Sequence, residues 1–205
     1  MADFNSLTVD QIRQCLTGRT ANTFDLAGNW SDTESKQAAV LIPFVQIHQQ
    51  WHLVFIRRAT HVSDIHSGQV AFAGGKFEQH DNDLLATALR EAREEIGLLP
   101  EDVTVLGKLN YHHSISRFRI TPVVASVPWP YPLTLDQLEV ARVFTIPLNW
   151  LANPAHYQIK QHQHEKNKAF PVVYFDKYDG ETLWGATARM TLSLISLLNL
   201  KHLPV

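Results

Sequence analysis

Cysteine is almost absent from this chain of 205 residues, which contains Cys15 and no other. A single thiol can form neither a disulfide within the chain nor a zinc site built from several cysteines, which is typical of a protein from a reducing compartment. The chain also lacks the basic start and apolar run of a secretion signal, and no apolar run approaches the roughly 18 residues of a membrane span. We therefore predict a cytoplasmic protein.

An excess of charge of one sign is absent as well. The 18 basic and 20 acidic side chains give a formal net charge of −2. Nothing in this balance indicates binding to nucleic acid or to a membrane surface through bulk electrostatics. With 45% apolar and 19% charged residues, the composition is that of an ordinary globular protein, and the length suits one substantial domain. Neither nucleic acid nor a membrane is expected as a partner.

The apolar pattern predicts a chain in which strands and helices are mixed. Two apolar runs, 38–47 and 51–58, predict a hairpin in which Pro43 suggests an edge strand or an irregularity. Further strands are expected over 103–111, 119–127 and 142–147, a second hairpin over 171–175 and 182–184, and helices over 6–16, 84–96 and 186–198. We assign 1–34 to an N-terminal helix and lead-in segment, and 35–205 to one domain.

A polar, histidine-rich stretch occupies 161–167 with the sequence QHQHEKN. Its composition predicts a solvated loop. Metal binding by its two histidines is the alternative.

Three glutamates are concentrated near the end of the helix predicted over 84–96. Glu91, Glu94 and Glu95 share one patch, because residues three and four apart are neighbours on a helix. One interpretation is a solvated acidic face balanced by Arg90 and Arg93. The other is a site for a hard cation, which takes oxygen ligands from carboxylates, backbone carbonyls and substrate phosphates. Gly74 and Gly75 precede the helix, and glycine lets a backbone carbonyl approach a ligand closely. This interpretation implies metal-assisted hydrolysis of a phosphate ester or anhydride.

The stretch 90–98, REAREEIGL, resembles the Nudix box, whose core is Arg-Glu-apolar-any-Glu-Glu-any-Gly-apolar. Every position is in register. The run from Gly75 to Arg90 is one residue longer than in the general box, and Asp81 is the counterpart of a further acidic residue. This spacing resembles the coenzyme A pyrophosphatase branch of the superfamily. The resemblance implies an α/β fold, a Nudix-type α/β/α sandwich with a mixed β-sheet on which the box helix packs.

Similarity to that branch extends from about 38 to 198, with departures. The upstream motif is matched by Arg58-Ala59 and by 68–75, but Ala73 replaces a proline. The loop between Arg58 and Gly68 is one residue longer than expected, and Ser63 and Asp64 stand where an arginine is usual. Farther on, the stretch 139–144 resembles a Glu-Val-Ala-Glu-Val-Phe motif, with Arg142 in place of the second glutamate.

The resemblance also implies roles for particular residues. Glu91 and Glu95 would ligate Mg²⁺ or Mn²⁺, Glu94 would support or join them, and Gly75 would offer its carbonyl oxygen. Arg90 would orient the carboxylates through charge-assisted hydrogen bonds, the alternative being a surface ion pair with Glu94. The candidates for binding substrate phosphates are Arg57, Arg58, Lys76, Arg117, Arg119 and Arg142; each alone is also compatible with a solvated surface charge.

The function expected from this resemblance is divalent-metal-dependent hydrolysis of a nucleoside diphosphate linked to another group. The expected substrate is coenzyme A or an acyl-coenzyme A, cut to 3′,5′-ADP and 4′-phosphopantetheine. One alternative is hydrolysis of ADP-ribose or a dinucleotide. Another is a non-catalytic module that binds a nucleotide, although such a module would gain nothing from three like charges on one helix face. A homodimer is compatible with the resemblance.

Overall fold

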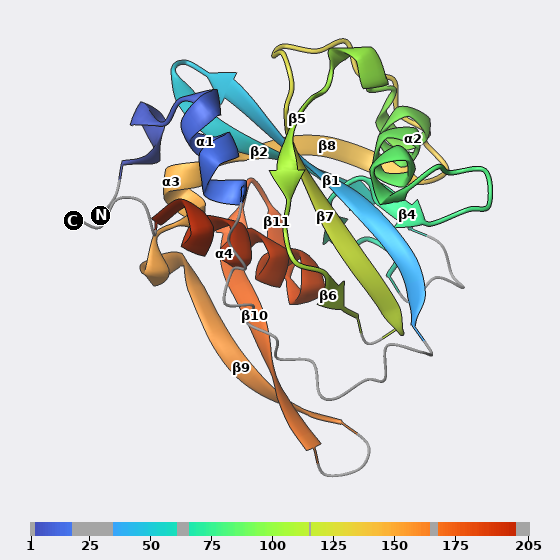
Figure 1. Cartoon of the computed structure of the whole chain (residues 1–205). Helices are drawn as coiled ribbons and strands as arrows, with labels where there is room; N and C mark the ends of the chain where they lie inside the picture. Colours follow the sequence, from blue (N-terminus) through green and yellow to red (C-terminus); the bar gives the residue numbers. More distant parts are fainter. Residues whose placement is uncertain (1–2, 18–34, 61–65, 115, 165–167, 200–205) are drawn as a thin grey trace.

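The computed structural model describes residues 3–17, 35–60, 66–114, 116–164 and 168–199. Within these ranges the chain forms a large mixed sheet with helices on both faces, and a second, smaller sheet (Figure 1). The predicted α/β/α sandwich is confirmed. No described helix has both the length and the apolar character that crossing a membrane requires. Most of the predicted lead-in segment (18–34) lies outside the described ranges, as do Ser63 and Asp64.

The main sheet contains eight strands and has β1 at its centre. Its order is β3-β2-β1-β7-β5, with β4 also pairing with β1, β6 with β7 and β8 with β2. β1 and β7 are parallel and the other pairs are antiparallel. The strands are β1 (Lys36–Ile47), β2 (Gln50–Arg58), β3 (Val70–Ala71), β4 (Gly74–Lys76), β5 (Thr104–Lys108), β6 (His112–His113), β7 (Phe118–Ser126) and β8 (Val140–Pro147).

The glycine segment, which forms β4 (Gly74–Lys76), pairs with the part of β1 that β2 does not cover. The end of β1 pairs with β2 from Phe44 onward, whereas its start pairs with β4 over Ala38, Ala39 and Val40. Pro43 lies between these two ladders, where a missing N–H is tolerated. The predicted irregularity at Pro43 is therefore confirmed, and the alternative of an edge strand is wrong because β1 is central.

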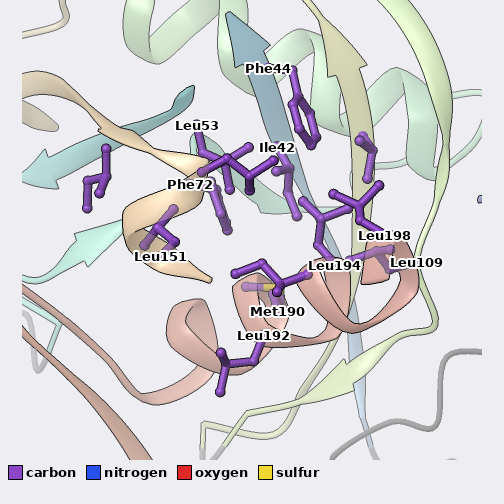
Figure 2. Close-up of a cluster of buried hydrophobic side chains, with 14 of the residues drawn as sticks. Ile42, Phe44, Leu53, Phe72, Leu109, Leu151, Met190, Leu192, Leu194 and Leu198 are labelled. Atoms are coloured by element: carbon purple, nitrogen blue, oxygen red, sulfur yellow. The ribbon is translucent and has the colours of Figure 1, made fainter. Parts of the chain in front are cut away.

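Two hydrophobic cores cover the two faces of the sheet. Helix α2 (Leu84–Ile96) packs on one face, and helices α1 (Val9–Leu16), α3 (Leu148–Leu151) and α4 (Gly185–Asn199) contribute to the core on the other. We call these the α2-side core and the α4-side core. Ala39 and Leu41 belong to the first, whereas Ile42 and Phe44 belong to the second, as the two-residue repeat of a strand requires. Figure 2 shows Ile42 and Phe44 in the cluster that Leu194 and Leu198 of α4 join.

The N-terminal helix packs into the α4-side core. Thr8 caps α1 through a reciprocal capping box with Gln11. The buried side of α1, which includes Ile12 and Leu16, contacts β5 and α4. A Cβ at Gly107 of β5 would lie 2.7 Å from the Cβ of Leu16, so glycine allows this close approach. Short 3₁₀ turns complete the fold at η1 (Phe4–Ser6), η3 (Pro100–Asp102) and η4 (Pro154–His156).

The second sheet contains β9 (Tyr157–His164), β10 (Lys168–Tyr178) and β11 (Glu181–Trp184). The β9–β10 hairpin extends away from the body of the domain (Figure 1). Residues 161–164 belong to β9, so the predicted loop over 161–167 is wrong there; 165–167 lie outside the described ranges. Backbone pairing with β10 forms this strand, and such pairing needs no apolar side chain. The predicted second hairpin is confirmed as β10 and β11.

Candidate active site

Helix α2 holds the predicted carboxylates in fixed positions. It begins after Asp83, whose side chain accepts a hydrogen bond from the backbone N–H of Ala86 at 2.8 Å, and it ends at Gly97, which is left-handed with φ of 70°. The buried face of the helix includes Ala88, Ala92 and Ile96 and packs on the sheet. The predicted helix over 84–96 is thus confirmed, and its other face presents the glutamates.

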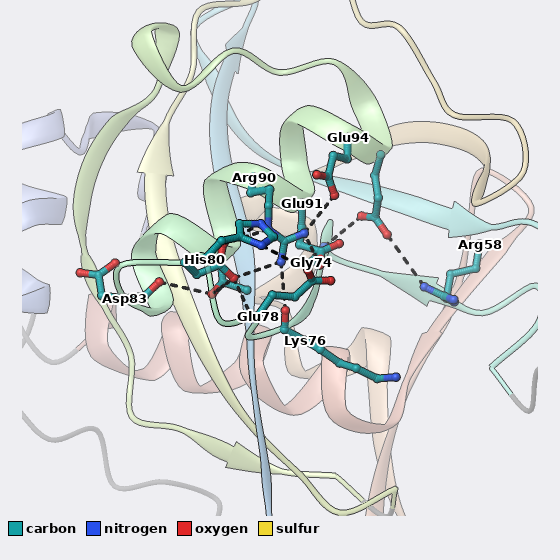
Figure 3. Close-up of polar contacts among 12 residues, drawn as sticks. Arg58, Gly74, Lys76, Glu78, His80, Asp83, Arg90, Glu91 and Glu94 are labelled. Atoms are coloured by element: carbon teal, nitrogen blue, oxygen red, sulfur yellow. Dashed lines mark hydrogen bonds and ion pairs between the residues drawn. The ribbon is translucent and has the colours of Figure 1, made fainter.

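Arg90 connects the helix to the glycine segment (Figure 3). Its guanidinium binds Asp81 with two hydrogen bonds of 2.9 and 3.1 Å and donates to the backbone oxygen of Lys76 at 3.0 Å. It also donates to Glu91 and to Glu94, both at 2.9 Å. The side chain of Arg90 is only 16% exposed, so this is more than the surface ion pair that was the alternative. Arg90 fixes both the loop and two of the glutamates.

Asp81 is a buried carboxylate whose two oxygens both accept hydrogen bonds and whose charge is paired with Arg90. Besides Arg90, it accepts hydrogen bonds from the hydroxyl of Thr87 at 2.9 Å and the backbone N–H of Glu78 at 3.0 Å. The Arg90 hydrogen bonds hold the pKa of Asp81 far below its usual range, against the opposing effect of burial. Asp81 therefore supports the loop as an anion whose charge is compensated.

Glu95 is equally buried but is compensated far less. Its side chain is 2% exposed and accepts a hydrogen bond from the backbone N–H of Gly74 at 2.9 Å. The nearest cation, Arg58, lies 3.9 Å away, which makes an ion pair but is too long for a hydrogen bond. Burial, together with the charge of Glu91, raises the pKa of Glu95 to about 8. Burial also raises the pKa of Glu91.

Gly75 lies directly against the carboxylate of Glu91. A Cβ at this position would be 2.5 Å from Oε1 of Glu91, so any other residue would push the carboxylate away. The lack of a side chain at Gly75 therefore permits this close contact with Glu91.

The donor set suits a hard divalent cation. No group of three or more His, Cys, Asp or Glu side chains within the described ranges lies close enough together to hold a metal unaided. Mg²⁺ does not require one, since it is usually held by one or two carboxylates together with substrate phosphates. Glu91 and Glu95 are two desolvated carboxylates next to the glycine pair, and a cation would supply positive charge close to both.

Glu139 is a residue of this site that the sequence prediction missed. Its negative charge contributes to raising the pKa of both Glu91 and Glu95. Its backbone is fixed by a hydrogen bond of 2.8 Å from the N–H of Ala59 to the carbonyl of Glu139, and the preceding loop is tied to the helix by the N–H of Asp136, which donates to the Glu95 carbonyl at 3.0 Å. The signal was available, because Glu139 opens the stretch 139–144 that resembles the coenzyme A branch.

The six candidate phosphate-binding residues do not gather at one point. Arg58 points to Glu95. The side chain of Lys76 points away from the glutamates (Figure 3) and its amino group lies 5.9 Å from the centre of the Phe118 ring. Arg119 lies over Tyr111 at 5.2 Å, and Arg117 occupies the left-handed turn before β7 with φ of 60°. Only Arg58 is in contact with the carboxylate cluster in this structure.

Arg57 and Arg142 lie on the other face of the sheet. They face each other across β2 and β8, and their neighbours Ile56 and Val143 pack into the α2-side core. Side chains alternate along a strand, so the two arginines project toward the opposite face. There both pair with Glu181 at 3.5 Å. Residue 142 therefore does not face the carboxylates of α2, because its side chain lies on the opposite face of the sheet.

Comparison with known proteins agrees with this architecture. The model of the NUDIX domain family matches residues 35–172. The chain is 39% identical over 155 residues, which is 75% of both chains, to an uncharacterized Nudix hydrolase NudL of Yersinia pestis (strain Pestoides F) and equally to one of Yersinia pseudotuberculosis serotype O:1b (strain IP 31758).

Solved structures of the same kind are more distant. The Nudix hydrolase RenU from M. smegmatis has 21% identity and a TM-score of 0.48, covering 57% of this chain and 73% of its own. A MutT/nudix family protein from Enterococcus faecalis has 14% identity and a TM-score of 0.48, covering 84% of this chain and 63% of its own.

Proposed function

The chain belongs to the NUDIX domain family and is a Nudix hydrolase, and from this premise we propose that it cleaves the diphosphate of coenzyme A or an acyl-coenzyme A. The products would be 3′,5′-ADP and 4′-phosphopantetheine or its acyl derivative. The observation that carries the chemistry is the pair Glu91 and Glu95, held on a rigid helix against a glycine backbone with too little positive charge around them. The choice of coenzyme A is supported by the branch-like sequence around the box.

Glu91 and Glu95 would hold Mg²⁺ or Mn²⁺, with help from Glu94 and the carbonyl of Gly75. The bound ion would activate water and neutralise charge on the diphosphate. Arg90 keeps Glu91 and Glu94 oriented through its hydrogen bonds and keeps the glycine segment in place through the Lys76 carbonyl. We assign no direct contact with substrate to Arg90.

Glu139 is our candidate for the group that accepts the proton of the attacking water. Its side chain is exposed, its charge acts on the half-buried Glu91 and the buried Glu95, and both its N–H and its carbonyl are hydrogen-bonded. A general base needs reach to the reacting water and a free carboxylate, and an exposed side chain next to the cluster meets both requirements. Arg58 is our candidate for a contact with the diphosphate, because it is the candidate cation nearest to Glu95.

ADP-ribose or a dinucleotide is the second candidate substrate. It is favoured by the departures in the motif that precedes the box, where Ala73 replaces proline and Ser63-Asp64 replaces the usual arginine. If those positions select the coenzyme A moiety in the branch, their alteration would relax the selection.

The test is a product assay on coenzyme A, acetyl-coenzyme A, ADP-ribose and NADH, with Mn²⁺ and with a chelator. We expect 3′,5′-ADP from the coenzyme A substrates only when metal is present, and none from Glu95→Gln. Faster release of AMP from ADP-ribose would select the second candidate. Binding of these compounds without cleavage of any of them would support the non-catalytic alternative.

A further inference from the structure

A groove of about 460 Å³ runs along the outer edge of β8. Within the described ranges β8 pairs with β2 alone, so the opposite edge of the strand is open. Its lining includes Trp129, Leu133, Arg142, Thr145, Tyr178 and Asp179. The volume lies within the range of roughly 300–1,000 Å³ that is usual for small-molecule sites. We call this feature the β8 groove; neither Glu91 nor Glu95 lines it.

The two walls of the groove carry aromatic rings from different parts of the fold. Trp129 and Leu133 come from the loop between β7 and β8 and pack against the α2-side core. Tyr178 comes from the end of β10, packs against the α4-side core and contacts Trp150 edge-on at 5.0 Å. Trp129 and Tyr178 are both partly exposed. Partly exposed rings anchored from behind are suited to stacking with a nucleobase.

Arg142 supplies the positive charge of the groove. Its side chain is 40% exposed, and its guanidinium donates to the backbone oxygen of Asp179 at 3.1 Å and pairs with the Asp179 carboxylate. It also lies 3.5 Å from Glu181. These contacts orient the planar group at the groove wall. Arginine has five N–H donors in a fork that matches phosphate geometry, so it can share a phosphate with these acidic partners.

The strand that lines the groove starts next to Glu139, whose carbonyl accepts a hydrogen bond from the N–H of Ala59, the neighbour of Arg58. Glu139, whose charge acts on Glu91 and Glu95, immediately precedes β8, and Arg142 follows three residues later. Three residues of strand span about 10 Å. A nucleotide lying along the β8 edge would therefore extend toward the carboxylates.

We propose that the β8 groove binds the phosphorylated nucleoside of the substrate, with the base against Trp129 and Tyr178 and a phosphate on Arg142. This proposal rests on the proposed function in taking the substrate to be a nucleotide. It gives Arg142, which replaces a glutamate of the coenzyme A branch, a role that its position on the other face of the sheet permits. The phosphate on Arg142 can be a 5′- or a 3′-phosphate, and binding experiments distinguish the two.

The experiment is calorimetric titration of the full-length protein with adenosine, AMP and 3′,5′-ADP in the presence of a chelator. We expect the wild-type protein to bind the nucleotides about tenfold more tightly than adenosine, because a charged hydrogen bond is added. Tyr178→Leu should weaken the binding of all three ligands about tenfold through loss of stacking. The double variant Arg142→Gln/Asp179→Asn, which preserves charge balance, should bind the nucleotides no better than adenosine.

Two matched variants serve as controls. Tyr174→Leu removes another tyrosine of β10, one that stacks on Trp184 outside the groove, and Arg93→Gln removes an exposed arginine on α2. Both should bind the three ligands like the wild-type protein. Tighter binding of 3′,5′-ADP than of AMP would assign Arg142 to the 3′-phosphate, and equal binding of the two would assign it to the 5′-phosphate.

The proposal is overturned if the wild-type protein binds none of the three ligands, if adenosine binds as tightly as the nucleotides, or if the groove variants behave like the controls. The double variant keeps the test decisive should Tyr178→Leu fail to fold. None of the three ligands contains a phosphoanhydride bond that could be cut, so nucleotide binding here is independent of turnover. Binding as expected combined with no cleavage of any diphosphate would leave the groove assignment standing and refute the proposed function.

Discussion

Asp81 and Glu95 are buried carboxylates near opposite ends of α2, and their surroundings shift their pKa values in opposite directions. Asp81 has an arginine in bidentate contact, a hydroxyl and a backbone N–H, and its pKa is depressed. Glu95 has one backbone N–H and a cation at 3.9 Å, and its pKa rises to about 8. The difference shows that burial alone does not define a role: the compensated carboxylate stabilises the fold, whereas the poorly compensated one is the carboxylate that we propose as a cation ligand.

The largest expected effect is on catalysis, from Glu95→Gln. Glutamine retains the size of the side chain and an oxygen for the Gly74 N–H but removes the charge, so kcat should fall by roughly 1,000-fold or more. The metal-free variant should unfold at the same temperature as the wild-type protein or a higher one, since a poorly compensated buried charge is gone. Steady-state kinetics measure the fall in kcat, and thermal unfolding measures the change in stability.

The control is the same change at Glu91, which should also abolish turnover while the protein stays folded. Wild-type turnover in both variants on every substrate would remove the catalytic interpretation of the helix and reduce Glu95 to a structural residue like Asp81.

Asp81→Asn should have the converse effect, a loss of stability that exceeds any direct loss of chemistry. The variant leaves Arg90 without its strongest partner and weakens the hydrogen bonds from Thr87 and Glu78, which should cost about 2 kcal/mol at neutral pH. Denaturant unfolding measures the change. Asp83→Asn is the matched control: Asp83 is exposed, and asparagine caps a helix as well as aspartate does, so its stability should be unchanged. If Asp81→Asn were as stable as the wild-type protein, Asp81 would not have the stabilising role that distinguishes it here from Glu95.

The pH dependence of metal-free stability should separate the two carboxylates. The pKa of Asp81 is depressed below its ordinary value of 3.8, so its contribution to stability is present above that pH and is lost as the pH falls through the lower pKa of the folded state. The pKa of Glu95 is raised from 4.5 to about 8, so its contribution is fully present below 4.5 and is lost as the pH rises through about 8. Asp81→Asn should therefore flatten the acid limb of the stability curve and Glu95→Gln the alkaline limb. Flattening of the same limb by both variants would contradict the assignment.

The sequence predicted α2 to the residue because every signal for it is local. The apolar spacing and the stop at Gly97, on which the prediction rested, lie within the helix or directly after it, and the cap that the structure adds at Asp83 lies directly before it.

Residues outside the box were less predictable, because tertiary pairing decides their positions. The sheet faces of Arg57 and Arg142 depend on the register between β2 and β8, which residue types do not reveal. The role of Glu139 depends on a loop that returns to the end of α2 through the Asp136–Glu95 backbone bond. Residues 161–164 of β9 were missed because the sequence QHQH has no apolar alternation.

The smallest expected effect on stability concerns Arg58. It is the cationic partner of Glu95, as Arg90 is of Asp81, but it lies farther from its carboxylate. Its side chain is 28% exposed and the 3.9 Å contact is long, so Arg58→Gln should change the free energy of unfolding by less than about 1 kcal/mol. Its effect should appear in binding instead, because its partly exposed side chain lies beside the carboxylates, where it can contact the substrate. If Arg58 contacts the coenzyme A moiety, KM should rise several-fold for coenzyme A and less for ADP-ribose, with kcat nearly unchanged. Kinetics on both substrates measure this, with Arg93→Gln as the exposed-arginine control.

Equal losses on the two substrates would show that Arg58 does not discriminate between them. A large loss of stability would show that it compensates Glu95 as fully as Arg90 compensates Asp81, and the contrast between the two carboxylates would then fail.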